Sequence, residues 1–216
     1  MDTAGYFWRL AGLACSYLSV APDSMNPLPA QEPIETPNLT LVPADPALAG
    51  QVLALHQRNR QHFSLGSPAH VLDRQDIAFW QQKLKQEQDG WHQGSRYCFY
   101  GMKEHQLICQ VQVSELVRGV FQAAYLGYKI DEQFQGLGLM REAVTAVIQF
   151  AFADLRLHRL MANYQPHNER SGQLLKRMGF RQEGIAEKYL YINGAWRDHV
   201  LTSLTNDQFD ASPLEP

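Results

Sequence analysis

The sequence predicts an α/β protein of one domain, with a mixed and mostly antiparallel sheet flanked by helices. Three observations lead to this fold class. Strand-like runs at 97–102, 106–113 and 120–130 follow one another directly, which predicts an antiparallel meander. Helix and strand patterns then alternate, as in proteins whose helices cover a sheet. Near the end of the chain, Asn193-Gly194 separates two strand-like runs and is a strong hairpin signal.

Composition bounds the class of protein. A chain of 216 residues with 45% hydrophobic and 19% charged residues can bury a full core in one domain. The net charge of −3 and the absence of a nucleic-acid motif argue against general nucleic-acid binding, whereas basic peptides or amines remain suitable partners. The three cysteines and eight histidines show no ligand spacing. We therefore expect no metal site, no disulfide framework and a reduced, cytoplasmic protein.

The amino terminus contains an apolar run, 10–21, that has the length of a signal-peptide core but not its basic flank. It is too short to span a bilayer, so no membrane association is expected. Residues 23–37 contain four prolines, which predicts an extended linker, and Met25 is an alternative start. We divide the chain into an extended or disordered segment (1–33), one domain (34–207) and a tail (208–216).

The first half of the domain is expected to hold one strand and two helices. A strand near Leu39 precedes Asp45-Pro46, a cap and first-turn pair for a helix with Leu48, Val52 and Leu55 on one face. A second helix is predicted from Asp73 to the Asp89-Gly90 stop, and its buried stripe consists of Ile77, Trp80 and Leu84.

A glycine turn is the most informative stretch of the chain. Gly136 and Gly138 separate the strand-like run 125–130 from a helix whose apolar positions are Met140, Val144, Val147, Ile148 and Ala151. Such a turn leaves backbone N–H groups free at the helix start and allows a phosphate to approach them. We predict a pyrophosphate cradle, although a tight turn into an ordinary core helix is an equal alternative. The stretch is neither a Walker loop nor a dinucleotide fingerprint.

The last part of the domain adds a strand, a helix and the hairpin. Residues 158–164 are strand-like, and Asn168 can cap a helix that ends at Gly179-Phe180. The hairpin strands are predicted at 187–192 and 196–204.

The spacing Gln133-x-x-Gly136-x-Gly138, followed by Asn168-x-x-Ser171, resembles the Gcn5-related N-acetyltransferases. Residues 161–171, 178–180 and 196–200 are similar to the branch of this family that acetylates the amino-terminal alanine of a bacterial ribosomal protein (RimJ type). The resemblance covers roughly 34–207. A departure lies after Phe63, where this sequence lacks the Pro-Trp pair usual in that branch.

The resemblance implies an acyl-CoA N-acyltransferase fold and acetyl-CoA as co-substrate. It implies transfer of the acetyl group to the α-amino group of a protein, the amino-terminal alanine of a small-subunit ribosomal protein, with ribosome or pre-ribosome association. An α-amino group, with a pKa near ~8, needs little help from a base. Two alternatives stay open: an acetyltransferase for a small amine such as an antibiotic or polyamine, and a ribosome-assembly or acetyl-CoA-sensing factor without turnover.

The resemblance also assigns candidate site residues. Ser171 and Tyr164 are the catalytic candidates, because the glutamate and tyrosine used by many relatives are replaced by Asn163 and Leu175. Ser171 would bond the sulfur of the coenzyme, or alternatively only the backbone near Asn168. The residues expected to bind the coenzyme are Tyr128, Ile130, Gln133, Gln135, Gly136, Leu137, Gly138, Leu139, Asn168 and Ser171.

Secondary candidates each have a structural alternative. Glu115 and Glu183 are possible water-linked bases or merely solvated charges. Three aromatic residues of the hairpin form an acceptor slot or pack across the strand pair, and two arginines touch coenzyme phosphates or stay exposed. These residues are Tyr189, Tyr191, Trp196, Arg141 and Arg170.

Overall fold

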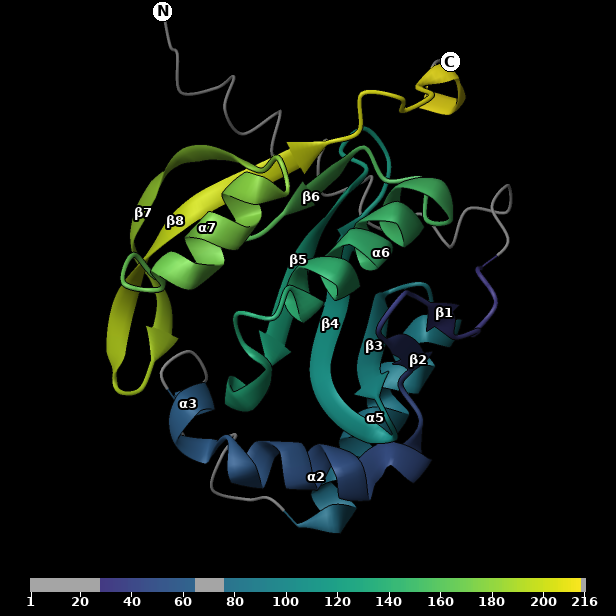
Figure 1. Ribbon diagram of the computed structural model, residues 1–216. Coiled ribbons are helices and arrows are strands. Elements are labelled where there is room, and N and C mark those ends of the chain that lie inside the picture. The colour runs from purple at the N-terminus through teal and green to yellow at the C-terminus, as the bar shows by residue number, and fades with distance from the viewer. Residues whose placement is uncertain (1–27, 65–75, 215–216) are drawn as a thin grey trace, which may run out of the picture.

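The computed structural model describes residues 28–64 and 76–214. In this part of the chain the strands form one sheet in the order β1-β2-β3-β4-β5-β6-β8-β7, and neighbours are antiparallel except β5 and β6 (Figure 1). The predicted mixed, mostly antiparallel sheet is confirmed. The strands are β1 (Ile34–Glu35), β2 (Thr40–Pro43), β3 (Arg96–Lys103), β4 (Gln106–Val117), β5 (Ala123–Ile130), β6 (Arg159–Met161), β7 (Arg181–Ile192) and β8 (Ala195–Thr205).

The helices cover both faces of the sheet and bury a core on each. Side chains of a strand alternate between faces, and β3 shows the result: Tyr97 and Phe99 join the core under α6, whereas Cys98 and Tyr100 join the core under α2 and α5. The helical segments are η1 (Pro46–Leu48), α2 (Ala49–Arg58), α3 (Arg60–Ser64), α5 (Ile77–His92), η2 (Glu132–Phe134), α6 (Leu139–Ala153), α7 (Glu169–Arg177) and η3 (Ser212–Leu214).

Helix starts agree with the capping signals better than helix ends do. Asp45 accepts a 2.7 Å hydrogen bond from the Ala47 N–H, as predicted. The second helix is capped by Asp76, and the predicted start at Asp73 lies outside the described residues. Ile77 was expected in the buried stripe but is 51% exposed. The predicted stop at Asp89-Gly90 is wrong, because α5 continues to His92 and packs Gly90 closely against Arg96.

Four strands differ in length from the prediction, and one of them is β6, which was predicted at 158–164 but spans only Arg159–Met161. β4 extends to Val117 and β7 begins at Arg181, six residues before the predicted start. β5 begins only at Ala123, and Val120 is 91% exposed. For β4 and β7 the reason is a bulge in each strand, which interrupts the two-residue alternation on which the prediction depended. The turn itself is as predicted, with positive φ at both Asn193 and Gly194.

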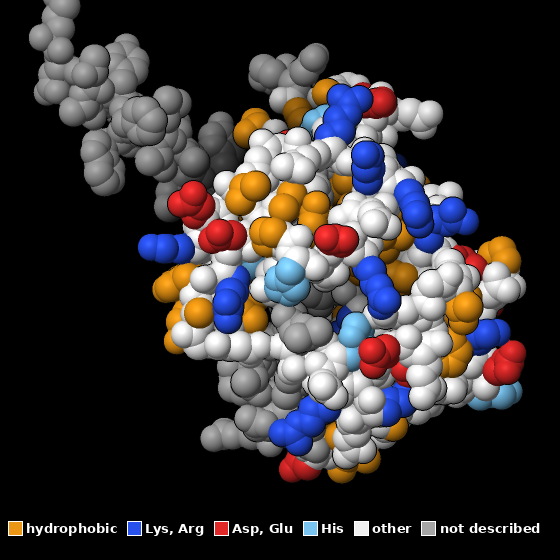
Figure 2. Space-filling view, turned by 60° about the vertical axis from the view of Figure 1, so that its left-hand side comes forward, with side chains coloured by type: hydrophobic (Ala, Val, Ile, Leu, Met, Phe, Trp, Pro, Cys, Tyr) orange, Lys and Arg blue, Asp and Glu red, His pale blue; other side chains and the backbone are white. Residues whose placement is uncertain are grey.

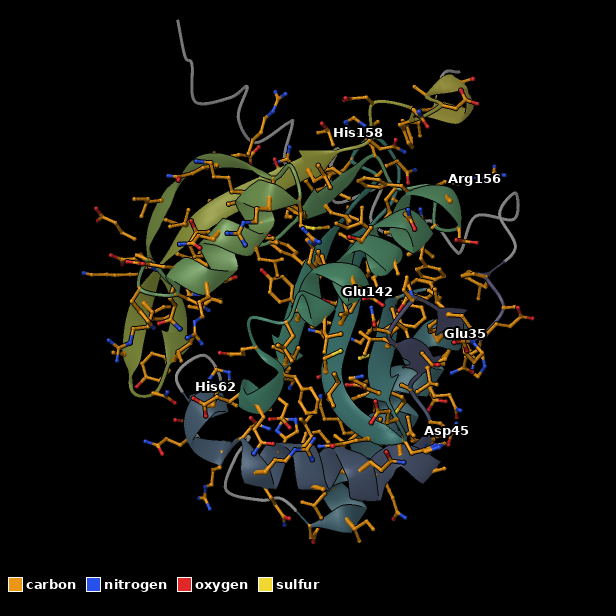
Figure 3. All side chains as sticks on the ribbon, in the orientation of Figure 1. Glu35, Asp45, His62, Glu142, Arg156 and His158 are labelled. Carbon is orange, nitrogen blue, oxygen red and sulfur yellow. The ribbon has the colours of Figure 1, made fainter. Side chains whose placement is uncertain are left out.

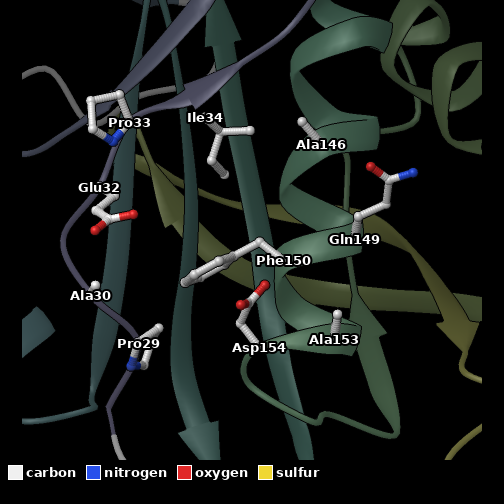
Figure 4. A pocket seen from close by; sticks show the side chains of 10 residues that line it. All are labelled: Pro29, Ala30, Glu32, Pro33, Ile34, Ala146, Gln149, Phe150, Ala153 and Asp154. Atoms are coloured by element: carbon white, nitrogen blue, oxygen red, sulfur yellow. The ribbon is translucent and has the colours of Figure 1, made fainter.

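The segment before β1 is packed rather than free. Pro29 accepts a 3.0 Å hydrogen bond from the Trp91 indole, and the Gln31 amide donates to Ala44 at 3.1 Å. Between this segment and α6 lies a cavity of about 360 Å³, shown in Figure 4, with Phe150 in its wall. The linker prediction is therefore wrong for residues 29–33, which have no regular structure but contact the domain.

The start of α6 is held by a carboxylate. Glu142, in the first turn of α6, accepts hydrogen bonds from the Thr36 hydroxyl (2.6 Å), the Asn38 N–H (2.7 Å) and the Asn38 amide (2.9 Å) (Figure 3). Burial by itself would raise the pKa of Glu142, but these bonds outweigh it and lower the pKa below its usual value. The first turn of α6 is thus attached to the segment between β1 and β2.

Candidate active site

The parallel strands β5 and β6 separate at one end and leave an opening between them. β5 pairs with β6 only from Ala123 to Tyr125. Beyond Met161 the chain follows β8 instead, through a bridge between Tyr164 and Val200. Within the described part of the chain, 126–130 therefore has no strand partner on this edge.

Alternation shows which backbone groups point into the opening. The Asp131 N–H donates toward β4, to Ile108, whereas the Gln122 carbonyl accepts from His158 on the β6 side. Alternate residues of a strand direct their backbone groups to the same side. Since Gln122 faces β6, the backbone groups of Leu126, Tyr128 and Ile130 face the opening. Such groups need water or a ligand as partner. An extended ligand with amide groups can bind there as an added strand does.

The glycine turn has a left-handed backbone at both of its glycines, which is compatible with the predicted cradle. Gly136 and Gly138 have φ values of +77° and +81°, in the left-handed region, and a Cβ at either position would meet nothing within 4 Å. Gly138 caps α6 without a side-chain bond, so the first N–H groups are available. Leu137 is 65% exposed, whereas the Leu139 side chain is buried in the core. Only the backbone of Leu139 can therefore serve a ligand.

A cluster of hydroxyl groups lies on one side of the opening. The Tyr128 and Ser171 hydroxyl oxygens are 2.8 Å apart, and Asn168 caps α7 by accepting from the Ser171 N–H at 3.2 Å. The Tyr164 ring packs against Gly172, where a Cβ would lie 2.7 Å from Tyr164 Cζ. Since the Ser171 hydroxyl bonds Tyr128, the alternative in which it bonds only the backbone near Asn168 is wrong.

The Tyr128 phenol is protonated at neutral pH. Burial raises its pKa to about 12, although the hydrogen bond with Ser171 lowers it in part. A phenol with so high a pKa is a hydrogen-bond donor and a weak acid. Together with Ser171 it can stabilise a developing negative charge.

A second polar cluster lies on the opposite face of β5. The Tyr189 hydroxyl is 3.3 Å from the Tyr125 hydroxyl and also accepts from the Asn163 amide at 3.3 Å. The hydrogen bond with Tyr189 is the main reason that the pKa of Tyr125 rises to about 12. Sequence reasoning missed Tyr125. The available signal was parity, since residues 125 and 128 point to opposite faces of one strand.

The two acidic candidates differ in their contacts. Glu183 forms an ion pair with Arg159 and accepts from Ser203 at 2.9 Å, and these bonds lower its pKa. It is therefore engaged elsewhere. Glu115 is exposed at the bulge of β4, and its charge acts on Tyr125.

The three aromatic candidates of the hairpin also differ in their contacts. Tyr191 and Trp196 pack across the strand pair with ring centroids 5.7 Å apart, which is the alternative to an acceptor slot, and each is 59% exposed. Tyr189 alone of the three contacts the second cluster. Arg141 is exposed on α6, and Arg170 donates to the Gln135 side chain.

Charge is mixed around this part of the surface. Figure 2 shows Lys and Arg side chains interspersed with Asp and Glu on the side that carries β7, β8 and α7. The net charge of −3 thus does not produce an acidic face there. Among the described residues there is no metal-binding group of His, Cys, Asp or Glu, and none of their helices is long and apolar enough to cross a membrane.

Sequence comparison identifies relatives. The sequence model of the acetyltransferase (GNAT) domain matches residues 38–181. The [ribosomal protein uS5]-alanine N-acetyltransferase of Escherichia coli K12 is 49% identical over 128 residues, which are 58% of this chain and 66% of that protein. The chain thus spans just under two thirds of that relative. The probable N-acetyltransferase YjcK of Bacillus subtilis is 33% identical over 160 residues, 73% of this chain and 88% of that protein.

Solved structures share the fold. A ribosomal-protein-S5-alanine acetyltransferase from Vibrio fischeri superposes with a TM-score of 0.78 at 36% identity, covering 83% of this chain and 99% of that one. Mycobacterium smegmatis RimJ in complex with CoA-disulfide gives 0.74 at 23% identity, covering 82% and 87%. The chain belongs to the Gcn5-related N-acetyltransferase (GNAT) family.

Proposed function

We propose that this protein transfers the acetyl group of acetyl-CoA to the α-amino group of an amino-terminal alanine, in a protein of the small ribosomal subunit. One observation supports this most directly: the open edge of β5 has the Tyr128–Ser171 hydroxyl pair on one face and the Tyr125–Tyr189–Asn163 cluster on the other. A thioester and an amine can thus approach the same gap from opposite faces.

Two backbone features support a position for the coenzyme. The free N–H groups after Gly136 and Gly138 suit the pyrophosphate, because they combine exposed donors with the positive end of α6. The backbone groups of Leu126, Tyr128 and Ile130 suit the amides of the pantetheine arm. We infer that the thioester of a coenzyme bound in this way lies near Ser171, whose hydroxyl bonds Tyr128.

The reaction needs a neutral amine and a stabilised leaving group. The amine nitrogen attacks the thioester carbonyl, the C–S bond breaks, and the thiolate departs as the amine loses a proton. An α-amino group, with a pKa near ~8, is partly neutral at cytoplasmic pH, so water suffices to take its proton. Ser171, polarised by Tyr128, donates a hydrogen bond to the thiolate sulfur. Tyr164, packed at Gly172, borders this group.

The acceptor is inferred from the relatives. Both the Escherichia coli and the Vibrio fischeri proteins are named for alanine acetylation of ribosomal protein S5. We extend that substrate to this chain, and with it a cytoplasmic location and encounter with the ribosome or pre-ribosome. A lysine side chain, with a pKa near ~10.4, would need a strong base, and Asn163 cannot act as one.

The test is a comparison of acceptors. We would measure kcat/KM for coenzyme A release with peptides that begin with Ala, Ser or Met, and with an acetyl-blocked peptide that contains a lysine. Spermidine and an aminoglycoside complete the panel. We expect the Ala peptide to lead by at least about tenfold. Preference for a small amine would replace the proposal with the second hypothesis, and no turnover with any acceptor would support a binding factor.

A further inference from the structure

Three contacts join residues 58–62, which connect the end of α2 to α3, to the loop that precedes the glycine turn. Arg58 forms an ion pair with Asp131, Asn59 Oδ1 accepts from the Glu132 N–H at 2.8 Å, and His62 Nε2 lies 2.7 Å from Gln135 Nε2. Each contact spans 73 positions of sequence. The helices and the loop are therefore attached along a strip and not at one point.

The inner two contacts are anchored in the core. Asp131 and Asn59 are buried, and Asn59 also donates to the Leu55 carbonyl at 3.0 Å. The outer contact differs, because Gln135 directly precedes Gly136 and the bond to His62 is only partly buried. This outer contact is the one that a small movement of the glycine turn would change first.

The orientation of the Gln135 amide is determined by its second partner. Its Oε1 accepts from the Arg170 guanidinium, which can only donate, so its Nε2 faces His62 and donates to it. Gln135 thereby links α7, on the hydroxyl-cluster side, to α3, which carries His62 (Figure 3).

The link continues to the amine side of the opening. The Asn193 amide donates to the Ser64 carbonyl at 2.5 Å, which attaches the end of α3 to the β7–β8 turn. Tyr189 of the same hairpin belongs to the polar cluster with Tyr125. Figure 1 shows α3 close to the lower end of this hairpin. One path of contacts thus runs from the glycine turn to the wall at which the amine is proposed to bind.

We propose that the His62–Gln135 hydrogen bond couples coenzyme binding to acceptor binding, with both residues acting as positioning residues; the acceptor half rests on the proposed function. Gly136 and Gly138 have no Cβ and restrict the loop little. A pyrophosphate bound at the turn fixes Gln135, and Gln135 then fixes His62 and α3. Because coenzyme binding has already ordered this segment, the acceptor does not lose that conformational entropy and binds more tightly.

The primary test does not depend on the acceptor. Hydrogen exchange of the amides of residues 60–64 is measured in the full chain with and without coenzyme A. We expect coenzyme A to slow this exchange about fivefold, the effect of one hydrogen bond, and His62→Ala to abolish the slowing. The conservative variant His62→Gln should restore it in part. Gln61→Ala, an exposed neighbour on α3, is the matched control and should behave as the parent.

The second test measures the coupling directly. The Kd of a peptide that begins with alanine is determined by calorimetry with and without coenzyme A. The parent should bind the peptide about fivefold to tenfold more tightly when coenzyme A is present, and His62→Ala should bring this ratio near one. A merely structural role would weaken binding in both conditions and leave the ratio unchanged.

The outcomes separate this inference from the proposed function. Unchanged exchange at residues 60–64 when the parent binds coenzyme A would overturn the coupling, whatever the acceptor. Equal slowing in the parent and in His62→Ala would overturn the role of His62. Coenzyme-dependent protection that His62→Ala removes, in a protein that acetylates no peptide, would support the contact and reject the proposed substrate.

Discussion

Substitution of Gly172 by alanine tests the packing of Tyr164 on α7. In an exposed helix interior this change stabilises a protein by up to about 1 kcal/mol, because alanine restricts the unfolded chain and favours the helix. Here the new Cβ would lie 2.7 Å from Tyr164 Cζ and from its hydroxyl oxygen, and 2.8 Å from Cε2. The ring must move to admit it.

The expected cost follows from these distances. Ordinary contact begins at 3.4 Å, so the ring or α7 must shift by about 0.7 Å, and overpacking of this kind costs roughly 1 to 3 kcal/mol. After the helix gain is subtracted, we expect Gly172→Ala to destabilise the protein by about 0.5 to 2 kcal/mol. In a Tyr164→Ala background the obstacle is gone, and the same change should stabilise by about 0.5 to 1 kcal/mol.

The assay is a double-mutant cycle. Free energies of unfolding are measured by urea denaturation for the parent, the two single variants and the double variant. The reversal of sign between backgrounds is the expected result, with a coupling energy of about 1 to 3 kcal/mol. If Gly172→Ala stabilises the protein by the same amount in both backgrounds, the Tyr164 ring does not lie against α7. That result would also refute the position of Tyr164 beside Ser171.

Three further predictions concern the site and a partly buried lysine. Gly138→Val should fold yet lose coenzyme A affinity, because valine is strained at φ +81° and blocks the turn. Undiminished affinity by calorimetry would refute the proposal that this turn binds the pyrophosphate. Ser171→Ala should lower kcat about tenfold to a hundredfold with little change in the Kd of coenzyme A, and an unchanged kcat would contradict its role. Lys129 is partly buried and its Nζ lies 3.3 Å from His56 Nε2; loss of hydration lowers its pKa from 10.5 to about 8. The charged form of Lys129 therefore destabilises the fold below pH 8, and this penalty is relieved as pH rises toward 10.5. Lys129→Met should therefore gain more stability, measured by urea denaturation, at pH 7 than at pH 10; an equal gain at both would refute the cost of burial.

The sequence by itself determined the local features of this protein. Helix caps at Asp45 and Asn168, the glycine turn before α6 and the Asn193-Gly194 hairpin all depend on interactions within a few residues, which spacing alone reports. The resemblance in motif was confirmed by the family match. The binding roles of the site residues and the domain limits stay predictions.

The tertiary structure decided what depends on contacts between distant segments. Bulges in β4 and β7 shifted strand ends, because the extra residue is defined only against a partner strand. Packing of residues 29–33 and the passage of α5 through Gly90 depend on neighbours far along the chain.

The same physical reason applies to the site. The sequence predicted that both Ser171 and Tyr128 bind the coenzyme. Only the fold brought their hydroxyl groups within 2.8 Å and placed Tyr125 on the opposite face. His62 and Gln135 had no local signal that joins them, since their contact spans 73 positions. Local spacing specifies the elements, and the pairing of the sheet specifies which side chains meet at its opening.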